Sequence, residues 1–334
     1  MSFLEKGIIA VGHVLADALG EGGQAFIERF GQSASPSHIS AELMDEFLST
    51  LSKEPALLVK PLTWKAGGGI ANMARIALAL GIKTEVWGSV GRDELGRFLR
   101  QEMVQAGAVA HLIESPSPTG VFCAIALEGN DKSITVSPSA ASDIRGADIP
   151  IDALHEGWIL YVDGLLIDSF PWLSRLAEKA LSRNMRIALD LSTPANAKRH
   201  AMELYGFADA YCDVVFANEA EFKAMGDAPF AFADSRPIWV VKKGGQGASS
   251  YFRGAKHHAD TTRIDAAVDI GAGDAFSAGF LLGSMEGLGR EACLRLGNAV
   301  ASAALKHPWQ PSNASAIRKA YEDERYLLSL SNTI

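Results

Sequence analysis

The sequence predicts an α/β fold in which helices flank a doubly wound, mostly parallel sheet and a small β-rich lid covers one edge. Three observations predict it: apolar, β-branched runs recur along the chain, most are followed by helical periodicity, and two stretches interrupt that alternation. The apolar runs occupy residues 7–14, 83–90, 158–162, 186–191, 213–217 and 238–241. Such alternation is typical of parallel strands joined by crossover helices.

The segment after the second run illustrates the helical signal. Its apolar residues Leu95, Phe98, Leu99 and Met103 fall on one stripe of a helix. Asp93 and Glu94 favour the N-terminus of this helix, and Gly107 ends it.

The two interruptions predict the lid. The first contains an amphipathic helix with Leu43, Phe47, Leu48 and Leu51 on its apolar face, and it returns through the apolar residues 57–59. The second predicts a hairpin, with strands at residues 121–127 and 133–137 joined by the turn Glu128-Gly129-Asn130-Asp131. We therefore expect a lid made of residues 17–63 and 119–137, and a large domain made of residues 1–16, 64–118 and 138–334. A lid implies closure over a ligand.

Composition excludes several classes of protein. With 334 residues, 48% of them hydrophobic and 21% charged, the chain is globular rather than disordered or fibrous. The net charge of −8 disfavours binding to nucleic acid or to anionic membranes. Cys123, Cys212 and Cys293 are too few and too far apart for a disulfide framework or a zinc site. No apolar run reaches the ~18 to 20 residues that cross a bilayer, so we expect a cytoplasmic protein.

The strongest chemical signal is Gly271-Ala272-Gly273-Asp274 at the start of an apolar helix. Small residues at a helix N-terminus leave backbone N–H groups free to bind an anion. A carboxylate at Asp274 suits the deprotonation of a hydroxyl that attacks phosphorus. The structural alternative is that Asp274 caps the helix and the glycines form the turn.

A second glycine motif, Gly67-Gly68-Gly69, also opens an apolar helix. These glycines let the backbone approach a ligand, and Asn72 can donate to and accept from a pair of hydroxyl groups. The motif predicts a polyol-binding turn, with an ordinary loop before a buried helix as the alternative. Neither glycine motif completes the dinucleotide-binding fingerprint, because Asn72 and Phe276 occupy the position of its third glycine.

Three weaker signals follow apolar runs. Asp190 ends one run, where α/β sheets place ligands. Asn218 and Glu221 share one face of the first turn of a helix, which suits a hydrated Mg²⁺ or simple helix capping. Lys242 precedes the glycine-rich segment from Gly244 to Gly247, which suits an anion or a plain turn between strands.

Taken in order, these motifs resemble the ribokinase-like (PfkB) carbohydrate and nucleoside kinases, over nearly the whole chain. The matching positions are Gly12 and Asp17, Gly67 and Gly68 with Asn72, Val90-Gly91-Arg92-Asp93-Glu94-Leu95-Gly96, Asn218 with Glu221, Gly244 with Gly247, and Gly271-Ala272-Gly273-Asp274. The layout is closest to the adenosine-kinase branch. The sequence departs from the family at Leu15, where many members have Asn, and at Val268-Asp269-Ile270, which precedes the anion-binding turn and bears on a monovalent-cation site.

The resemblance implies an ATP- and Mg²⁺-dependent kinase that phosphorylates a hydroxyl, typically a primary hydroxymethyl, of a sugar derivative. In that reading, Asp274 is the general base and Gly271, Ala272 and Gly273 form the anion hole. The implied substrate contacts are Asp17, Gly67, Gly68 and Asn72, and the implied nucleotide contacts are Asn218, Lys242, Gly244, Gly247 and Asn298. Glu221, through water, and Asp190 would serve the metal. A nucleoside kinase and a catalytically silent sugar-binding protein are the alternatives, and a homodimer is compatible with the family.

Overall fold

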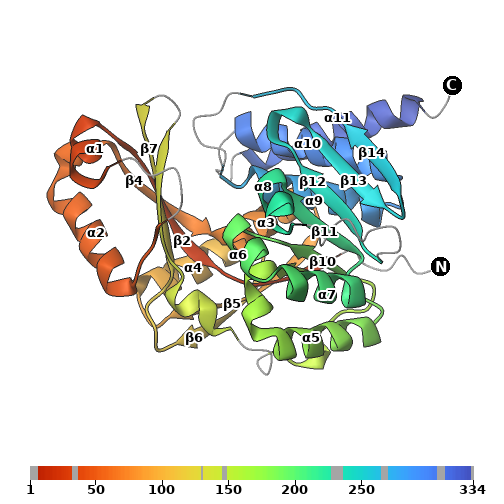
Figure 1. Ribbon diagram of the computed structural model, residues 1–334, viewed down its shortest axis with the longest axis horizontal. Coiled ribbons are helices and arrows are strands. Elements are labelled where there is room, and N and C mark those ends of the chain that lie inside the picture. The colour runs from red at the N-terminus through yellow and green to blue at the C-terminus, as the bar shows by residue number, and fades with distance from the viewer. Residues whose placement is uncertain are drawn as a thin grey trace.

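The computed structural model describes residues 7–31, 37–128, 131–144, 149–226, 236–264, 270–306 and 313–331. Within these residues the strands form two sheets (Figure 1). The larger sheet has nine strands in the order β14-β13-β12-β11-β10-β9-β1-β5-β6. These strands are β1 (Gly7–Val11), β5 (Lys83–Gly91), β6 (Val109–Ser115), β9 (Ile159–Asp163), β10 (Arg186–Asp190), β11 (Val214–Asn218), β12 (Ile238–Lys242), β13 (Ala248–Phe252) and β14 (Ala255–Ala259). All pairs from β6 to β12 are parallel, and β13 and β14 add an antiparallel edge.

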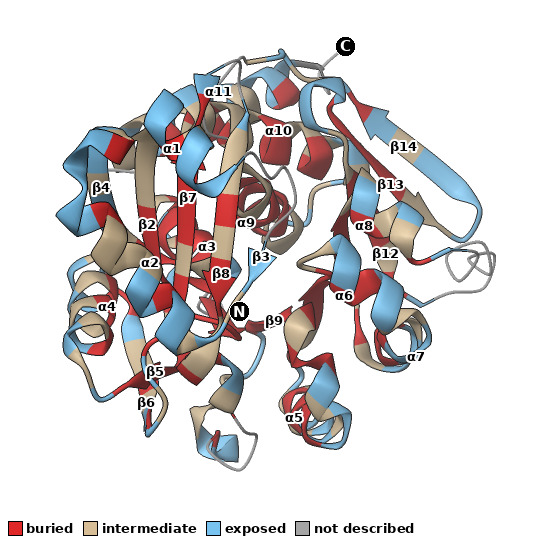
Figure 2. Cartoon of the chain, turned by 60° about the vertical axis from the view of Figure 1, so that its left-hand side comes forward, coloured by how far each residue is buried: buried red, intermediate tan, exposed pale blue. Residues whose placement is uncertain are grey.

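Helices cover both faces of the larger sheet, which confirms the predicted doubly wound α/β class. Alternate residues of β1 show the division, because Ile8 packs into one core and Ile9 into the other. The first core includes side chains of α3 (Gly68–Ala79), α4 (Glu94–Gln105), α9 (Ala272–Met285), α10 (Arg290–Lys306) and α11 (Ala314–Ser331). The second includes side chains of α5 (Phe170–Ser182), α6 (Pro194–Arg199) and α7 (Ala201–Tyr211), and the short α8 (Glu219–Ala224) packs on α6. Figure 2 shows the buried strands between helices whose outer surfaces are exposed.

The second sheet has the strand order β3-β8-β7-β2-β4 within the described residues. Its strands are β2 (Leu15–Gly22), β3 (Ser37–His38), β4 (Leu58–Gly67), β7 (Val121–Ala126) and β8 (Lys132–Ser137). With α1 (Gln24–Phe30) and α2 (Ala41–Lys53) it forms the lobe at the left of Figure 1. The antiparallel β7–β8 pair is the predicted hairpin, although Gly129 and Asn130 of its turn lie outside the described residues. A lid function for this lobe stays a prediction.

The first apolar run is not one strand, as the sequence predicted, but two elements. β1 ends at Val11, and the chain enters the second sheet at Leu15. The turn between them is fixed to the larger sheet, since the Gly12 N–H donates to the Trp87 carbonyl and the His13 N–H donates to Asp163. The change of sheet therefore occurs beside the middle of β5 and the carboxyl end of β9.

None of the helices among the described residues is long and apolar enough to span a membrane.

Candidate active site

The carboxyl ends of β10, β11 and β12 face the N-terminus of α9 across a cleft of about 790 Å³. Residues from all three strand ends, from the turn after β12 and from α9 and α10 line this cleft. Among them are Asp190, Asn218, Glu221, Lys242, Gly244, Gly247, Gly271, Ala272, Gly273, Asp274 and Asn298. The fold thus brings together the residues that the sequence nominated for catalysis, nucleotide binding and metal binding. Lys132, at the start of β8, also lines the cleft, so the second sheet borders it.

The glycine turn before α9 has the geometry of an anion-binding site. Gly271 occupies the N-cap position with φ 87°, a left-handed conformation that favours glycine. Ala272, Gly273 and Asp274 form the first turn, where main-chain N–H groups lack helical partners. The helix dipole adds positive potential at this end. The turn can therefore stabilise negative charge in the cleft.

Asp274 carries a carboxyl group with an unusual proton affinity. Burial, together with repulsion from Asp190, raises its pKa to about 7, while Lys242 and a hydrogen bond from the Asn72 side chain lower the pKa in part. A Cβ added to Gly69 would lie only 3.5 Å from Asp274 Oδ1, so this carboxylate also faces the first glycine motif. A carboxyl group with a pKa near 7 can accept a proton and release it at neutral pH.

Lys242 is the cation of the cleft nearest to the anion-binding turn. Its Nζ lies 2.8 Å from Asp190 Oδ2, and a Cβ added to Gly273 would lie 3.3 Å from the same Nζ. Burial alone would lower the pKa of Lys242, but the charges of Asp190 and Glu221 raise it above its ordinary value. The Tyr161 hydroxyl donates to the same Asp190 oxygen over 3.1 Å. The ammonium group is therefore charged and held in place.

Asn218 and Glu221 form a capping box at the start of α8, as the structural alternative predicted. The Asn218 N–H donates to Glu221 Oε2 over 2.8 Å, and the Glu221 N–H donates to Asn218 Oδ1 over 2.8 Å. Glu221 is nevertheless unusual for a cap, because burial and then repulsion from Asp190 raise its pKa to about 7. Since the cap already uses both side chains, they suit the water shell of a cation better than direct coordination.

The first glycine motif meets a carboxylate of the second sheet. Asp17, on β2, is buried, and its Oδ1 accepts a hydrogen bond of 3.2 Å from the Gly68 N–H. A Cβ on Gly67 would lie 1.8 Å from Asp17 Cγ, so only glycine leaves room for this carboxylate. Lys65 Nζ lies 3.8 Å from Asp17 Oδ2. Burial raises the pKa of Asp17, and the positive charges of Lys65 and Arg75 oppose that rise.

Asn72 links this group to the anion-binding turn. It lies in the first part of α3, and its Cγ would be 3.5 Å from a Cβ on Gly271. Asp17, Gly67, Gly68 and Asn72 are not among the residues that line the cleft, but Asn72 donates to Asp274 and so joins them to it. Asp274 thus contacts both the first glycine motif and the cleft that contains Lys242.

Comparison with known proteins identifies the family of this chain. The family described as pfkB family carbohydrate kinase matches residues 39–310, which is more than half of the chain. The chain belongs to the pfkB family of carbohydrate kinases. It is accordingly a carbohydrate kinase, and the family implies that it uses ATP.

Individual proteins to which the chain is similar include curated relatives and solved structures. The chain is 26% identical over 265 residues to the 2-dehydro-3-deoxygluconokinase of Bacillus subtilis, covering 72% of this chain and 81% of that protein. It is 25% identical over 285 residues to 5-dehydro-2-deoxygluconokinase 2 of Bacillus cereus, covering 75% and 83%. The adenosine kinase of Sinorhizobium meliloti superposes with a TM-score of 0.82 at 22% identity, covering 94% and 99% of the two chains. A protein described as a "probable sugar kinase" from Rhizobium etli gives a TM-score of 0.82 at 22% identity, covering 95% and 98%. Both structures are similar to this chain in fold.

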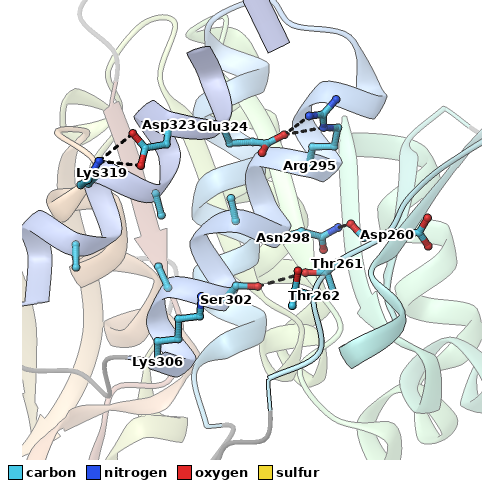
Figure 3. A pocket seen from close by; sticks show the side chains of 14 residues that line it. Asp260, Thr261, Thr262, Arg295, Asn298, Ser302, Lys306, Lys319, Asp323 and Glu324 are labelled. Carbon is cyan, nitrogen blue, oxygen red and sulfur yellow. Dashed lines mark hydrogen bonds and ion pairs between the residues drawn. The ribbon is translucent and has the colours of Figure 1, made fainter. Parts of the chain in front are cut away.

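A second cleft, of about 580 Å³, continues from the first between α10 and α11 (Figure 3). Asn298 borders both clefts, together with Thr261, Thr262 and Ser302. The Asn298 amide nitrogen donates to the carbonyl groups of Ala259 and Asp260, over 3.0 and 3.2 Å. Asn298 therefore fixes the chain that forms one wall of both clefts.

Sequence reasoning missed several groups around the site. Tyr161, Lys65 and Arg75 were not singled out. The His13 ring lies 2.8 Å from Asp163 in a buried pair behind the cleft. A polar residue inside an otherwise apolar run is the signal that could have drawn attention to Tyr161 and Arg75. The Val268-Asp269 part of the cation-site departure lies outside the described residues.

Proposed function

We propose that this carbohydrate kinase transfers the γ-phosphoryl group of ATP to a hydroxyl group of a sugar derivative, with Asp274 as general base. The observation that carries the proposal is the position of Asp274. It lies between the Asn72 and Gly69 side of the site and the cleft that contains Lys242, and its pKa is raised to about 7. A base of that pKa is half ionised at neutral pH.

The reaction balances with the groups present. The Asp274 carboxylate accepts the hydroxyl proton as the hydroxyl oxygen forms a bond to the γ-phosphorus, and the bond from that phosphorus to the bridging oxygen of ADP breaks. The N–H groups of Gly271, Ala272 and Gly273 donate to the phosphoryl oxygens, on which negative charge is concentrated. Lys242 contributes a fixed positive charge on the nucleotide side. Closure of the second sheet would exclude water, which would otherwise accept the phosphoryl group.

A hydrated Mg²⁺ suits the acidic residues of the cleft. No cluster of three or more His, Cys, Asp or Glu side chains among the described residues could bind a metal by itself. Mg²⁺ bound chiefly by phosphates and water does not need such a cluster. When bound, the ion supplies positive charge to the phosphates. Glu221 and Asn218 would hold its water molecules, with Asp190 beside them.

The substrate class that we propose first is a dehydro-deoxygluconate, because the curated relatives carry the names of such kinases. Nucleosides come second, on the basis of fold similarity to adenosine kinases alone. The monovalent-cation requirement, the homodimer and the cytoplasmic location stay predictions.

The deciding experiment measures ATP-dependent ADP release with a panel of sugar acids, neutral sugars and nucleosides, beside Asp274→Asn. Stimulation by a sugar acid, lost in the variant although the ligand still binds, supports the proposal. Stimulation by adenosine alone would replace the sugar derivative with a nucleoside. Binding of a sugar by the wild type without turnover would favour the silent sugar-binding protein.

A further inference from the structure

Arg75 is a buried cation directly behind the first glycine motif. It lies on α3, one turn after Asn72, and only 2% of its surface is exposed. Its Nη1 donates to the Ala66 carbonyl, and its Nη2 donates to Asn72 Oδ1 over 2.7 Å. The Ala66 N–H donates in turn to the carboxylate of Glu102 on α4, over 3.2 Å. One guanidinium group thus binds both the end of β4, which leads into the glycine turn, and the side-chain amide of Asn72, which follows that turn.

This contact fixes the orientation of the Asn72 amide. A guanidinium group can only donate hydrogen bonds, so the Asn72 atom that faces Arg75 must be its oxygen. The amide nitrogen then faces α9, 3.6 Å from the position of a Cβ on Gly271, and donates to the Asp274 carboxylate. A rotated amide would present its oxygen to the carboxylate and replace an attraction by a repulsion.

Arg75 also supplies charge. Its guanidinium interacts favourably with the carboxylates of Asp17, Glu102 and Asp274, and burial lowers its pKa only to about 10, so it remains positive at neutral pH. Arg75 is absent from the lining of the cleft. Its influence on the reaction must therefore pass through other residues.

We propose that Arg75 is a positioning residue for phosphoryl transfer, which orients the Asn72 amide so that it donates to the catalytic carboxylate of Asp274. This inference rests on the proposed role of Asp274 as the general base. The two can be separated, because loss of the base is tested by Asp274→Asn, whereas loss of orientation is tested at Arg75 and Asn72.

The test is a double-mutant cycle of Arg75→Lys and Asn72→Ala, with kcat measured across pH. Arg75→Lys keeps the positive charge but cannot make both forked hydrogen bonds. We expect kcat to fall about tenfold, the effect of one hydrogen bond to a charged group, with less change in KM. The acidic limb of the kcat profile should move to higher pH, because the carboxylate loses a donor. In the Asn72→Ala background, Arg75→Lys should lower kcat no further.

The control is Arg100→Lys, since Arg100 on α4 also donates to a main-chain carbonyl, that of Leu112, outside the site. It should alter melting temperature but not the pH profile. Additive effects in the cycle, or a loss of stability in Arg75→Lys with kcat and its profile unchanged, would overturn the proposal. Arg75→Met removes the charge as well and should shift the profile further. If neither Arg75 variant folds, the residue is structural and the proposal is wrong.

Discussion

Replacement of Asp274 by Asn tests the base directly, because the amide has nearly the same shape and cannot accept the proton. General-base catalysis typically contributes about 10²- to 10⁴-fold, so we expect kcat/KM to fall by that factor. In the wild type, a pKa of about 7 for Asp274 predicts that kcat/KM rises about tenfold per pH unit below neutrality and levels off above it. Asp274→Asn should lose this limb. The assay is coupled ADP release at constant ionic strength from about pH 5.5 to 9, and a variant that keeps both its rate and its acidic limb would refute the assignment.

Asp274→Asn should lower activity but raise the stability of the folded protein. The pKa of Asp274 is raised from 3.8 to about 7 on folding, so the folded state holds a proton that the unfolded chain releases. That shift corresponds to at most about 4 kcal/mol. Because the carboxyl group is only half-buried and lines an open cleft, we expect screening to leave about 2 kcal/mol. Stability of the wild type is lost as pH rises from about 4 to 7, so the advantage of Asp274→Asn should be small near pH 4 and constant above 7. A thermal melt of the ligand-free variant at pH 8 that is no higher than wild type would contradict this.

Three further substitutions test other parts of the site. Gly67→Ala should destabilise the protein by about 1 to 3 kcal/mol and weaken substrate binding, because its Cβ would overlap Asp17. Gly206→Ala is the control in thermal melts, because a Cβ at Gly206 on α7 would meet open space. This control should stabilise the protein by about 0.5 to 1 kcal/mol. Equal changes in melting temperature for the two variants would refute the steric argument. Lys242→Met should raise the KM for ATP about tenfold or more, and an unchanged KM would place the nucleotide elsewhere. The acidic limb should move to higher pH, because the ammonium group lowers the pKa of Asp274 and of Glu221. Glu221→Gln keeps one acceptor oxygen for the Asn218 N–H but loses the acceptor of the Asn218 amide nitrogen, so melting temperature should fall modestly. The Mg²⁺ concentration for half-maximal rate should rise several-fold, and an unchanged Mg²⁺ dependence would remove Glu221 from the water shell of the metal.

Local sequence was sufficient to predict six of the parallel strands of the larger sheet, but not their order. Buried parallel strands leave short apolar runs, and residues that follow them collect at the same edge of the sheet. Each of Asp190, Asn218 and Lys242 was singled out at the end of an apolar run, and the structure shows that all three line one cleft. β4 was mostly missed because it carries Pro61 and exposed side chains such as Lys60, which are unusual in a strand.

Arg75 could not be found by the same reasoning, because its partners come from tertiary structure. The residues of α3 on either side of it are buried, so the helix has no polar face on which a charge would be expected. Only the fold shows that its head group lies between the Ala66 carbonyl and Asn72. An arginine within an apolar helix is therefore a sequence signal for a buried network, but its role needs the neighbouring elements.

The charges in the cleft favour an enzyme over a silent binding protein. Asp274 and Glu221 both have a pKa raised to about 7. In both, the charge of Asp190 disfavours the ionised carboxylate and the charge of Lys242 favours it. Two carboxyl groups of this kind reduce the stability of the folded state at neutral pH, and a protein that only binds a neutral sugar gains nothing from placing one of them at an anion-binding helix terminus. A phosphotransferase does gain, because it needs a proton acceptor and a metal-attracting acid within one cleft, each close to its ionisation point. The roles proposed for Asp274 and Glu221 would account for this cost in stability, whereas the binding of a neutral sugar would not.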